Sequence, residues 1–245
     1  MLRFFTPEPL LDSGEGFSLY DPAHWIALLL CALLIAWLCR SQRSVAPEQR
    51  LRGRRWVGAA ALLCELLRLG SFLLQGCLTR DYLPLHLCSL MVFLLFWHSR
   101  RPNAGLGELL YCAGMPGALL ALLFPNWGCY AAWQFHSLLA FLGHSLLVAY
   151  PLMLVLSGEC RPLPRRLPAC FLALLVMAVP VYIFNVFFDT NYMFLLRPSK
   201  GSPLGFFAEQ GGYAAYLLSY LAAMALAWAA LYAPFARKGT NGCGE

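Results

Sequence analysis

Seven long apolar runs constrain this chain more than any other feature of its sequence. A helix needs about 20 apolar residues to cross the roughly 30 Å hydrocarbon core of a bilayer. Runs that reach or approach this length occupy residues 23–39, 56–77, 83–99, 106–124, 133–156, 167–188 and 212–235. They are continuous, whereas membrane β-barrel strands are segments of about ten residues with alternating polarity. The sequence therefore predicts an all-α membrane protein, a bundle of seven transmembrane helices.

The composition excludes an ordinary water-soluble domain. Hydrophobic residues make up 60% of the chain and charged residues 12%, against about 45–50% and about 25% in soluble proteins. We expect a polar N-terminal segment over 1–22, a single seven-helix transmembrane domain over 23–235, and a tail over 236–245.

The basic residues predict the orientation of this bundle. Thirteen lie in one alternating set of connections or in the tail: Arg40, Arg43, Arg50, Arg52, Arg54, Arg55, Arg100, Arg101, Arg161, Arg165, Arg166, Arg237 and Lys238. The other set carries Arg3, Arg80, Arg197 and Lys200. Cytoplasmic loops carry the excess of Lys and Arg, so we expect the N-terminus outside and the C-terminus in the cytoplasm. The net charge of +6 then follows from topology and requires no nucleic-acid partner.

Ionisable residues inside the apolar runs are the candidate functional positions, because hydrocarbon makes them costly. Glu65 and Arg68 lie three residues apart in the run 56–77 and therefore share one helix face. Two interpretations are open: an internal ion pair that fixes helix packing, or a carboxylate that orients a catalytic histidine.

His86 and Cys88 lie near the start of the run 83–99. On a continuous helix they point about 200° apart, so both face one substrate only if Pro84 distorts the turn. A membrane cysteine is often a small apolar filler. The nearby histidine and the helix N-terminus favour a thiolate and hence a nucleophile.

His136 and His144 both lie on the run 133–156. They are eight residues apart, which places them about 80° apart around a helix. Each is compatible with an interhelical hydrogen bond or with a role as general base. The rise per residue puts His136 closer in depth to Cys88 than His144. The sequence alone leaves His136, His144 and His86 open as the base.

A polar stripe marks the end of the run 167–188. Tyr182, Asn185 and Asp189 repeat at helical spacing, and Asn191 and Tyr192 follow at once. The stripe is compatible with a seam that ties neighbouring helices together or with a site for a lipid headgroup or carbonyl. An amide such as Asn185 is also a candidate donor to an oxyanion.

Four blocks of sequence resemble the YwaF family of bacterial membrane proteins, which is similar to animal transmembrane protein 164. They are L-P-L-H-L-C-S-L over 83–90, E-L-L-Y-x-x-G over 108–114, F-L-G-H-S over 141–145, and N-x-x-x-D-T-N-Y over 185–192 with Ser202-Pro203. The stretch 211–216 departs from the family pattern, since it reads G-G-Y-A-A-Y where a Pro- and Trp-rich sequence is usual.

The resemblance implies an acyltransferase of a bacterial plasma membrane that moves a fatty acyl chain between phospholipids through a cysteine acyl-enzyme. It implies Cys88 as nucleophile and His144 as catalytic histidine, with His86 assisting. Supporting positions are His136, Glu65, Arg68, Glu108, Asn185, Asp189, Asn191 and Tyr192. The expected substrates are phospholipid and lysophospholipid, with neither metal nor cofactor. With water as acceptor the protein would be a hydrolase. The alternative is a transporter or receptor without enzymatic activity, whose outward polar cavity binds a lipid or small solute.

Overall fold

The computed structural model describes residues 2–11, 16–199 and 202–236, and within these ranges it contains helices and no strand. Eight α-helices carry the fold: α1 (Pro22–Arg43), α2 (Pro47–Leu74), α3 (Leu87–Arg100), α4 (Ala104–Leu109), α5 (Met115–Leu123), α6 (Phe135–Leu156), α7 (Leu167–Phe188) and α8 (Leu204–Ala236). A π-helical turn, η3 (Leu110–Gly114), joins α4 to α5. Short 3₁₀ turns are η1 (Leu2–Phe5), η2 (Glu8–Leu10), η4 (Pro164–Arg166) and η5 (Tyr192–Phe194). The expected tail lies outside the described residues from 237 onward.

Six segments of the described chain are long and apolar enough to cross a membrane. They are α1, α2, α4 to α5, α6, η4 with α7, and α8. The seventh apolar helix, α3, has 14 residues and covers about 20 Å at the usual rise. Exposed Trp, Leu and Phe side chains cover the outer faces of these helices, as expected where lipid replaces water. The chain is therefore a multi-pass membrane protein.

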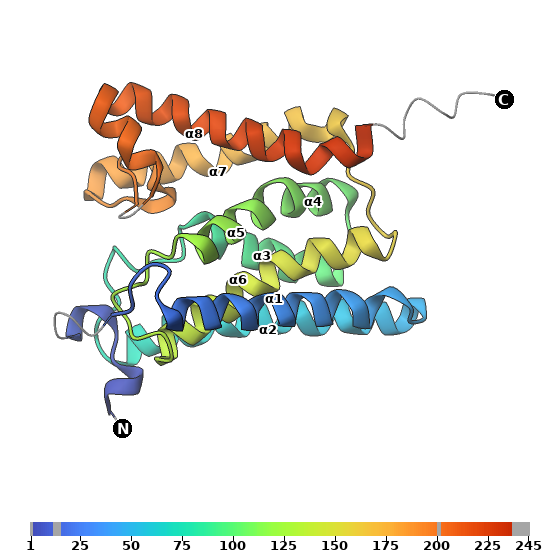
Figure 1. The fold of residues 1–245 in the computed structure, drawn as a ribbon, viewed down its shortest axis with the longest axis horizontal. Coiled ribbons are helices and arrows are strands. Elements are labelled where there is room, and N and C mark those ends of the chain that lie inside the picture. The colour runs from blue at the N-terminus through green and yellow to red at the C-terminus, as the bar shows by residue number, and fades with distance from the viewer. Residues whose placement is uncertain (1, 12–15, 200–201, 237–245) are drawn as a thin grey trace.

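The most buried helices are α4 to α6. In the most apolar stretch of α4–α5, 61% of residues are buried, against 6% in that of α8. Helix α6 contacts α1, α2, α3 and α5, while α7 and α8 run along the side of the molecule away from α1 and α2 (Figure 1). The connections 75–86 and 124–134 and the described residues 189–199 lie at one end, here called the Cys88 end. The connections 44–46, 101–103 and 157–163 lie at the other, here called the Glu108 end.

Helix α1 begins as its sequence predicts. Asp21 is the N-cap, its carboxylate accepts the His24 N–H at 2.7 Å, and Pro22 occupies the first helical position. That hydrogen bond lowers the pKa of the Asp21 carboxyl, because it stabilises the charged form. Proline is favoured at this position, where its missing N–H leaves no hydrogen bond unmade.

Two expected helix starts are shifted in the structure. Helix α3 begins at Leu87 rather than near Pro84, so residues 83–86 are a non-helical lead-in. Helix α8 begins at Leu204 rather than at residue 212, and it is broken at Gly212, whose φ is +65°. Glycine tolerates this left-handed backbone because it has no Cβ.

The π-helical turn η3 follows from the proline in the next helix. Pro116 has no N–H, so the usual α-helical hydrogen bond to the carbonyl of Cys112, four residues earlier, cannot form. The indole Nε1–H of Trp228 on α8 donates to that carbonyl at 2.8 Å. Tyr111 in the same turn donates to the carbonyl of Leu231 at 3.0 Å. These two hydrogen bonds attach α8 to the buried part of the bundle.

Candidate functional site

Cys88 lies in the first turn of α3, next to a histidine that is not helical. His86 is the N-cap of α3, with φ −66° and ψ 149°. The 200° separation of a continuous helix therefore does not apply to this pair, because the backbone is extended at His86. The N-cap side chain makes no hydrogen bond to the first turn, which leaves the leading N–H groups of α3 without a side-chain cap. Cys88 itself is half-buried and its thiol is free.

The ring of His86 is held by the connection between α7 and α8. Its Nδ1 accepts the backbone N–H of Met193 at 3.2 Å. The ring also contacts the aromatic rings of Tyr192 and Phe194, with centroids 4.9 Å and 5.4 Å away. The connection 189–203 is thus a direct neighbour of the Cys88 turn.

His144 is held on α6 by a backbone contact and a stacked ring. Its Nδ1 lies 2.7 Å from the carbonyl of Ala140, one turn earlier. A carbonyl only accepts, so this nitrogen carries the proton. The indole of Trp127 stacks on the imidazole, with ring centroids 4.9 Å apart. No pattern in the sequence points to Trp127, because it comes from the connection 124–134 rather than from a neighbouring turn.

Glu65 and Arg68 form the internal pair that their spacing predicts. Arg68 donates from Nε to one carboxylate oxygen at 3.1 Å and from Nη2 to the other at 2.6 Å. Its Nη1 donates to the carbonyl of Tyr82 at 3.3 Å. The third bond satisfies a backbone group in the non-helical segment before α3, which matters where water is excluded.

These side chains converge at the Cys88 end. Cys88 lies within electrostatic range of Glu65. His86 lies within the same range of Glu65, Arg68 and His144. We call Cys88, His86, His144, Glu65 and Arg68 the Cys88 cluster. Within the described part of the chain, Cys88 Sγ and the Nε2 atoms of both histidines have no hydrogen-bond partner.

His136 is engaged elsewhere despite its matching depth. Its Nε2 lies 2.7 Å from the Ser71 hydroxyl, which donates to the carbonyl of Arg68. Its ring stacks on Tyr130 with centroids 5.1 Å apart. These contacts tie α6 to α2 and to the connection 124–134, and they occupy the Nε2 atom of His136.

The polar stripe at the end of α7 stabilises the loop that follows this helix. Asn185 is fully buried, and its amide nitrogen donates to the carbonyl of Tyr192 at 2.9 Å. Its side-chain oxygen accepts hydrogen bonds from the Tyr192 N–H and the Thr190 hydroxyl, at 2.8 Å each. The side-chain oxygen of Asn191 accepts the N–H groups of Leu196 and Arg197. The Asn185 amide is thus occupied within the loop, which argues against the expected oxyanion role.

Tyr192 joins this loop to the segment before α3. Its hydroxyl donates to the carbonyl of Arg80 at 2.6 Å and accepts the N–H of Leu83 at 2.7 Å. Burial raises the pKa of Tyr192 to about 12, so the hydroxyl stays protonated and keeps both bonds at neutral pH. Asp189, by contrast, is exposed and pairs with Arg197 at 3.3 Å.

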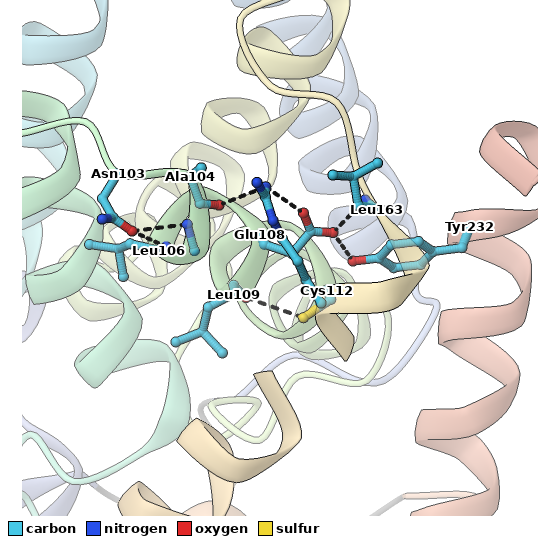
Figure 2. Close-up of polar contacts among 10 residues, drawn as sticks. Asn103, Ala104, Leu106, Glu108, Leu109, Cys112, Leu163 and Tyr232 are labelled. Atoms are coloured by element: carbon cyan, nitrogen blue, oxygen red, sulfur yellow. Dashed lines mark hydrogen bonds and ion pairs between the residues drawn. The ribbon is translucent and has the colours of Figure 1, made fainter. Parts of the chain in front are cut away.

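Glu108 lies in α4 at the opposite end of the molecule, in contacts that Figure 2 shows. Its fully buried carboxylate accepts the N–H of Leu163 at 3.0 Å and the hydroxyl of Tyr232, and it pairs with Arg166 at 3.5 Å. We call these four residues the Glu108 cluster. It connects α4, the connection 157–163 and α8, so Glu108 stands apart from the Cys88 cluster.

Two tyrosines of α8 are parts of the site that the sequence did not reveal. Tyr216 donates to the carbonyl of Phe194, and Tyr220 donates to that of Met193 at 3.5 Å. Tyr220 also lies within electrostatic range of Cys88. The only available signal was the spacing of Tyr213, Tyr216 and Tyr220 along an otherwise apolar helix, since a tyrosine carries a polar group on an apolar ring.

No group of three or more His, Cys, Asp or Glu side chains arranged to hold a metal ion occurs among the described residues. The site has one thiol, two imidazoles with a free nitrogen each, and an internally paired carboxylate. This set of groups suits nucleophilic and acid–base chemistry.

The family model for the TMEM164 family matches residues 19–232, which include both clusters and all of the α-helices except the end of α8. No curated protein and no solved structure matches significantly. The chain belongs to the TMEM164 family.

Proposed function

We propose that the protein is a membrane-embedded phospholipid acyltransferase that works through an acyl-thioester on Cys88. The observation that carries this proposal is the Cys88 cluster, in which a half-buried thiol follows His86 by two residues and His86 lies within electrostatic range of His144. The Nε2 atoms of both histidines have no partner in the described chain. Groups left unpaired beside a nucleophile suit a substrate that completes their hydrogen bonds.

His144 is the general base in this proposal. Its Nδ1–H is directed at the carbonyl of Ala140, so the neutral ring carries its lone pair on Nε2. A side-chain base that is oriented through its other nitrogen is the arrangement that activates weak nucleophiles. The indole stacked on the ring fixes its plane.

The reaction runs in two balanced halves. His144 Nε2 takes the thiol proton, the sulfur bonds to the ester carbonyl carbon, and the oxyanion collapses to the thioester as the lysophospholipid alkoxide leaves with that proton. In the second half the hydroxyl of another lysophospholipid gives its proton to His144 and attacks the thioester, which regenerates the thiol. The uncapped N–H groups at the start of α3 are suitable oxyanion donors.

The topology in this proposal has seven spans, with the N-terminus outside and the positively charged connections in the cytoplasm. Helix α3 completes its span with the non-helical residues before it. Such backbone is tolerated at membrane depth where protein satisfies its polar groups, as Arg68 and Tyr192 do for Tyr82, Arg80 and Leu83. The Cys88 cluster then opens toward the outer leaflet.

The test is turnover by the purified protein in lipid nanodiscs. A phospholipid with a labelled acyl chain and an unlabelled lysophospholipid are supplied, and the labelled diacyl product is measured. Cys88→Ala should reduce transfer to background, and Cys88→Ser should do nearly the same. Cys160→Ala, at a thiol of similar exposure in the connection 157–163, should keep wild-type activity. Equal transfer by Cys88→Ala and wild type would refute the proposal and leave a binding or transport function as the explanation of the cluster.

A further inference from the structure

The two histidines of the Cys88 cluster are held in opposite tautomers. The backbone N–H of Met193 can only donate, so Nδ1 of His86 must accept and carries a lone pair. The proton of the neutral His86 ring is then on Nε2. In His144 the carbonyl of Ala140 can only accept, so the proton is on Nδ1 and the lone pair on Nε2.

The donor that sets the His86 tautomer comes from strained backbone. Met193 and Phe194 have φ values of +54° and +55°, a region that residues with a Cβ rarely adopt. Such strain persists only where the surrounding structure holds it, and it clusters at functional sites. Here Tyr220 holds the carbonyl of Met193, and Tyr216 holds that of Phe194.

The polar stripe at the end of α7 also helps to hold the strained backbone at Met193 and Phe194. Asn185 closes the turn from Thr190 to Tyr192, and the Tyr192 hydroxyl anchors the turn to the segment before α3. The Met193 N–H therefore reaches His86 from a loop attached on three sides. The stripe therefore positions the Met193 N–H, in addition to packing helices together.

We propose that His86 is a second catalytic residue, whose Nε2–H donates a hydrogen bond to the acyl carbonyl oxygen while His144 handles the thiol proton. This assignment rests on the proposed acyl transfer at Cys88. No proton leaves His86 in the reaction: the oxyanion accepts its hydrogen bond, and collapse of the intermediate releases it. Met193 is a positioning residue, since it acts only through the imidazole.

The tautomers are tested without any activity measurement. Protein labelled with ¹⁵N-histidine in nanodiscs gives separate signals for protonated and unprotonated ring nitrogens, assigned with His86→Asn and His144→Asn. His24 is an internal reference for the Nε2–H form, because its Nε2 lies 3.0 Å from the carbonyl of Leu122 and its Nδ1 accepts the N–H of Tyr20. His86 should match His24, and His144 should show the opposite pattern. A proton on Nδ1 of His86 overturns the assignment.

The catalytic role is tested with two amides. In His86→Asn the side-chain oxygen takes the place of Nδ1 and still accepts the Met193 N–H, but nothing replaces Nε2–H. In His86→Gln the amide N–H reaches the Nε2 position. Acylation of Cys88 should fall about 100- to 1000-fold in His86→Asn, the usual cost of losing one oxyanion donor, with less than a threefold change in KM. His86→Gln should acylate Cys88 at least tenfold faster than His86→Asn does.

The pH profile separates this role from that of the base. His86→Asn should keep the wild-type pH dependence of acylation, because His144 remains, while the rate falls at every pH. A wild-type rate in His86→Asn, or equal rates in the Asn and Gln variants, overturns the donor role. A wild-type protein that never acylates Cys88 refutes the proposed function instead, and the ¹⁵N signals then still decide the tautomer assignment.

Discussion

The Cys88 and Glu108 clusters both place ionisable groups in the interior of the molecule, but they differ in how completely those groups are paired. Both carboxylate oxygens of Glu108 have partners, from three different segments of the chain. In the Cys88 cluster the sulfur and two imidazole nitrogens have none among the described residues. A cluster whose polar groups are all paired suits a role in holding helices together, whereas groups without a protein partner beside a thiol are available to a substrate. Under the proposed function, this difference separates a structural role for Glu108 from a chemical role for Cys88.

The largest effect is expected at the base of the Cys88 cluster. In His144→Asn the amide N–H takes the place of Nδ1–H and keeps the bond to the Ala140 carbonyl, while the lone pair of Nε2 is lost. Acylation should fall about 10²- to 10⁴-fold, the usual contribution of a general base. Stopped-flow or quenched acylation of Cys88 measures the rate, and thermal unfolding checks that stability is nearly unchanged. Normal acylation in this variant would remove His144 from the mechanism.

The second-largest effect is expected at Glu108, as a loss of folding stability. Glu108→Ala leaves the Tyr232 hydroxyl and the Leu163 N–H without their acceptor. Unpaired buried donors cost about 1–3 kcal/mol each, so for these two we expect a loss of about 2–6 kcal/mol in thermal or denaturant unfolding. Glu108→Gln keeps an acceptor and should lose less. Activity per folded molecule should be unchanged in both variants. A large fall in activity with normal stability would show that the two clusters are not distinct.

A smaller effect tests the link between the α7–α8 loop and the site. Tyr192→Phe removes one hydroxyl that serves both Arg80 and Leu83, which should cost about 1–3 kcal/mol and slow acylation several-fold as the loop loosens around His86. Tyr213→Phe is the matched control, because its hydroxyl is exposed and donates to the carbonyl of Leu195 at 3.0 Å. Identical behaviour of the two variants in unfolding and acylation assays would contradict the anchoring role of Tyr192.

The smallest effect is expected at Asp189. Its ion pair with Arg197 is exposed on both sides, and such pairs contribute about 0–1 kcal/mol. Asp189→Asn removes the charge and keeps a residue that tolerates the left-handed φ of +50°. Stability should change by less than about 0.5 kcal/mol and acylation by less than twofold. A tenfold loss of activity would instead place Asp189 in the substrate path.

The sequence pattern predicts those features of the structure that depend on residues close together in the chain. The apolar runs match the helices of the bundle, Pro22 starts α1 as expected, and the spacing of Glu65 and Arg68 corresponds to a real ion pair. The lead-in at His86 was not predictable, because an apolar run shows no helix break when the residues that hold it open are elsewhere. Tyr192 and Met193 lie 109 and 107 residues from the partners they contact there.

The partners of Glu108 illustrate the same limit. Tyr232 is 124 residues away in the sequence, and nothing in the run 212–235 distinguishes it from other membrane-interface tyrosines. Depth along a helix also does not say which neighbour a side chain contacts, as His136 illustrates. Ser71 and Tyr130 occupy His136 from elements that its own helix pattern does not reveal.

Intact mass of the purified protein after incubation with a single defined phospholipid tests the acyl-enzyme most directly. The account predicts a mass increase of one acyl group, located on the peptide that contains Cys88, released by hydroxylamine and lost when lysophospholipid is added. Transfer of the labelled chain between lipids with no covalent species on the protein, or with the acyl group on a different residue, would contradict it.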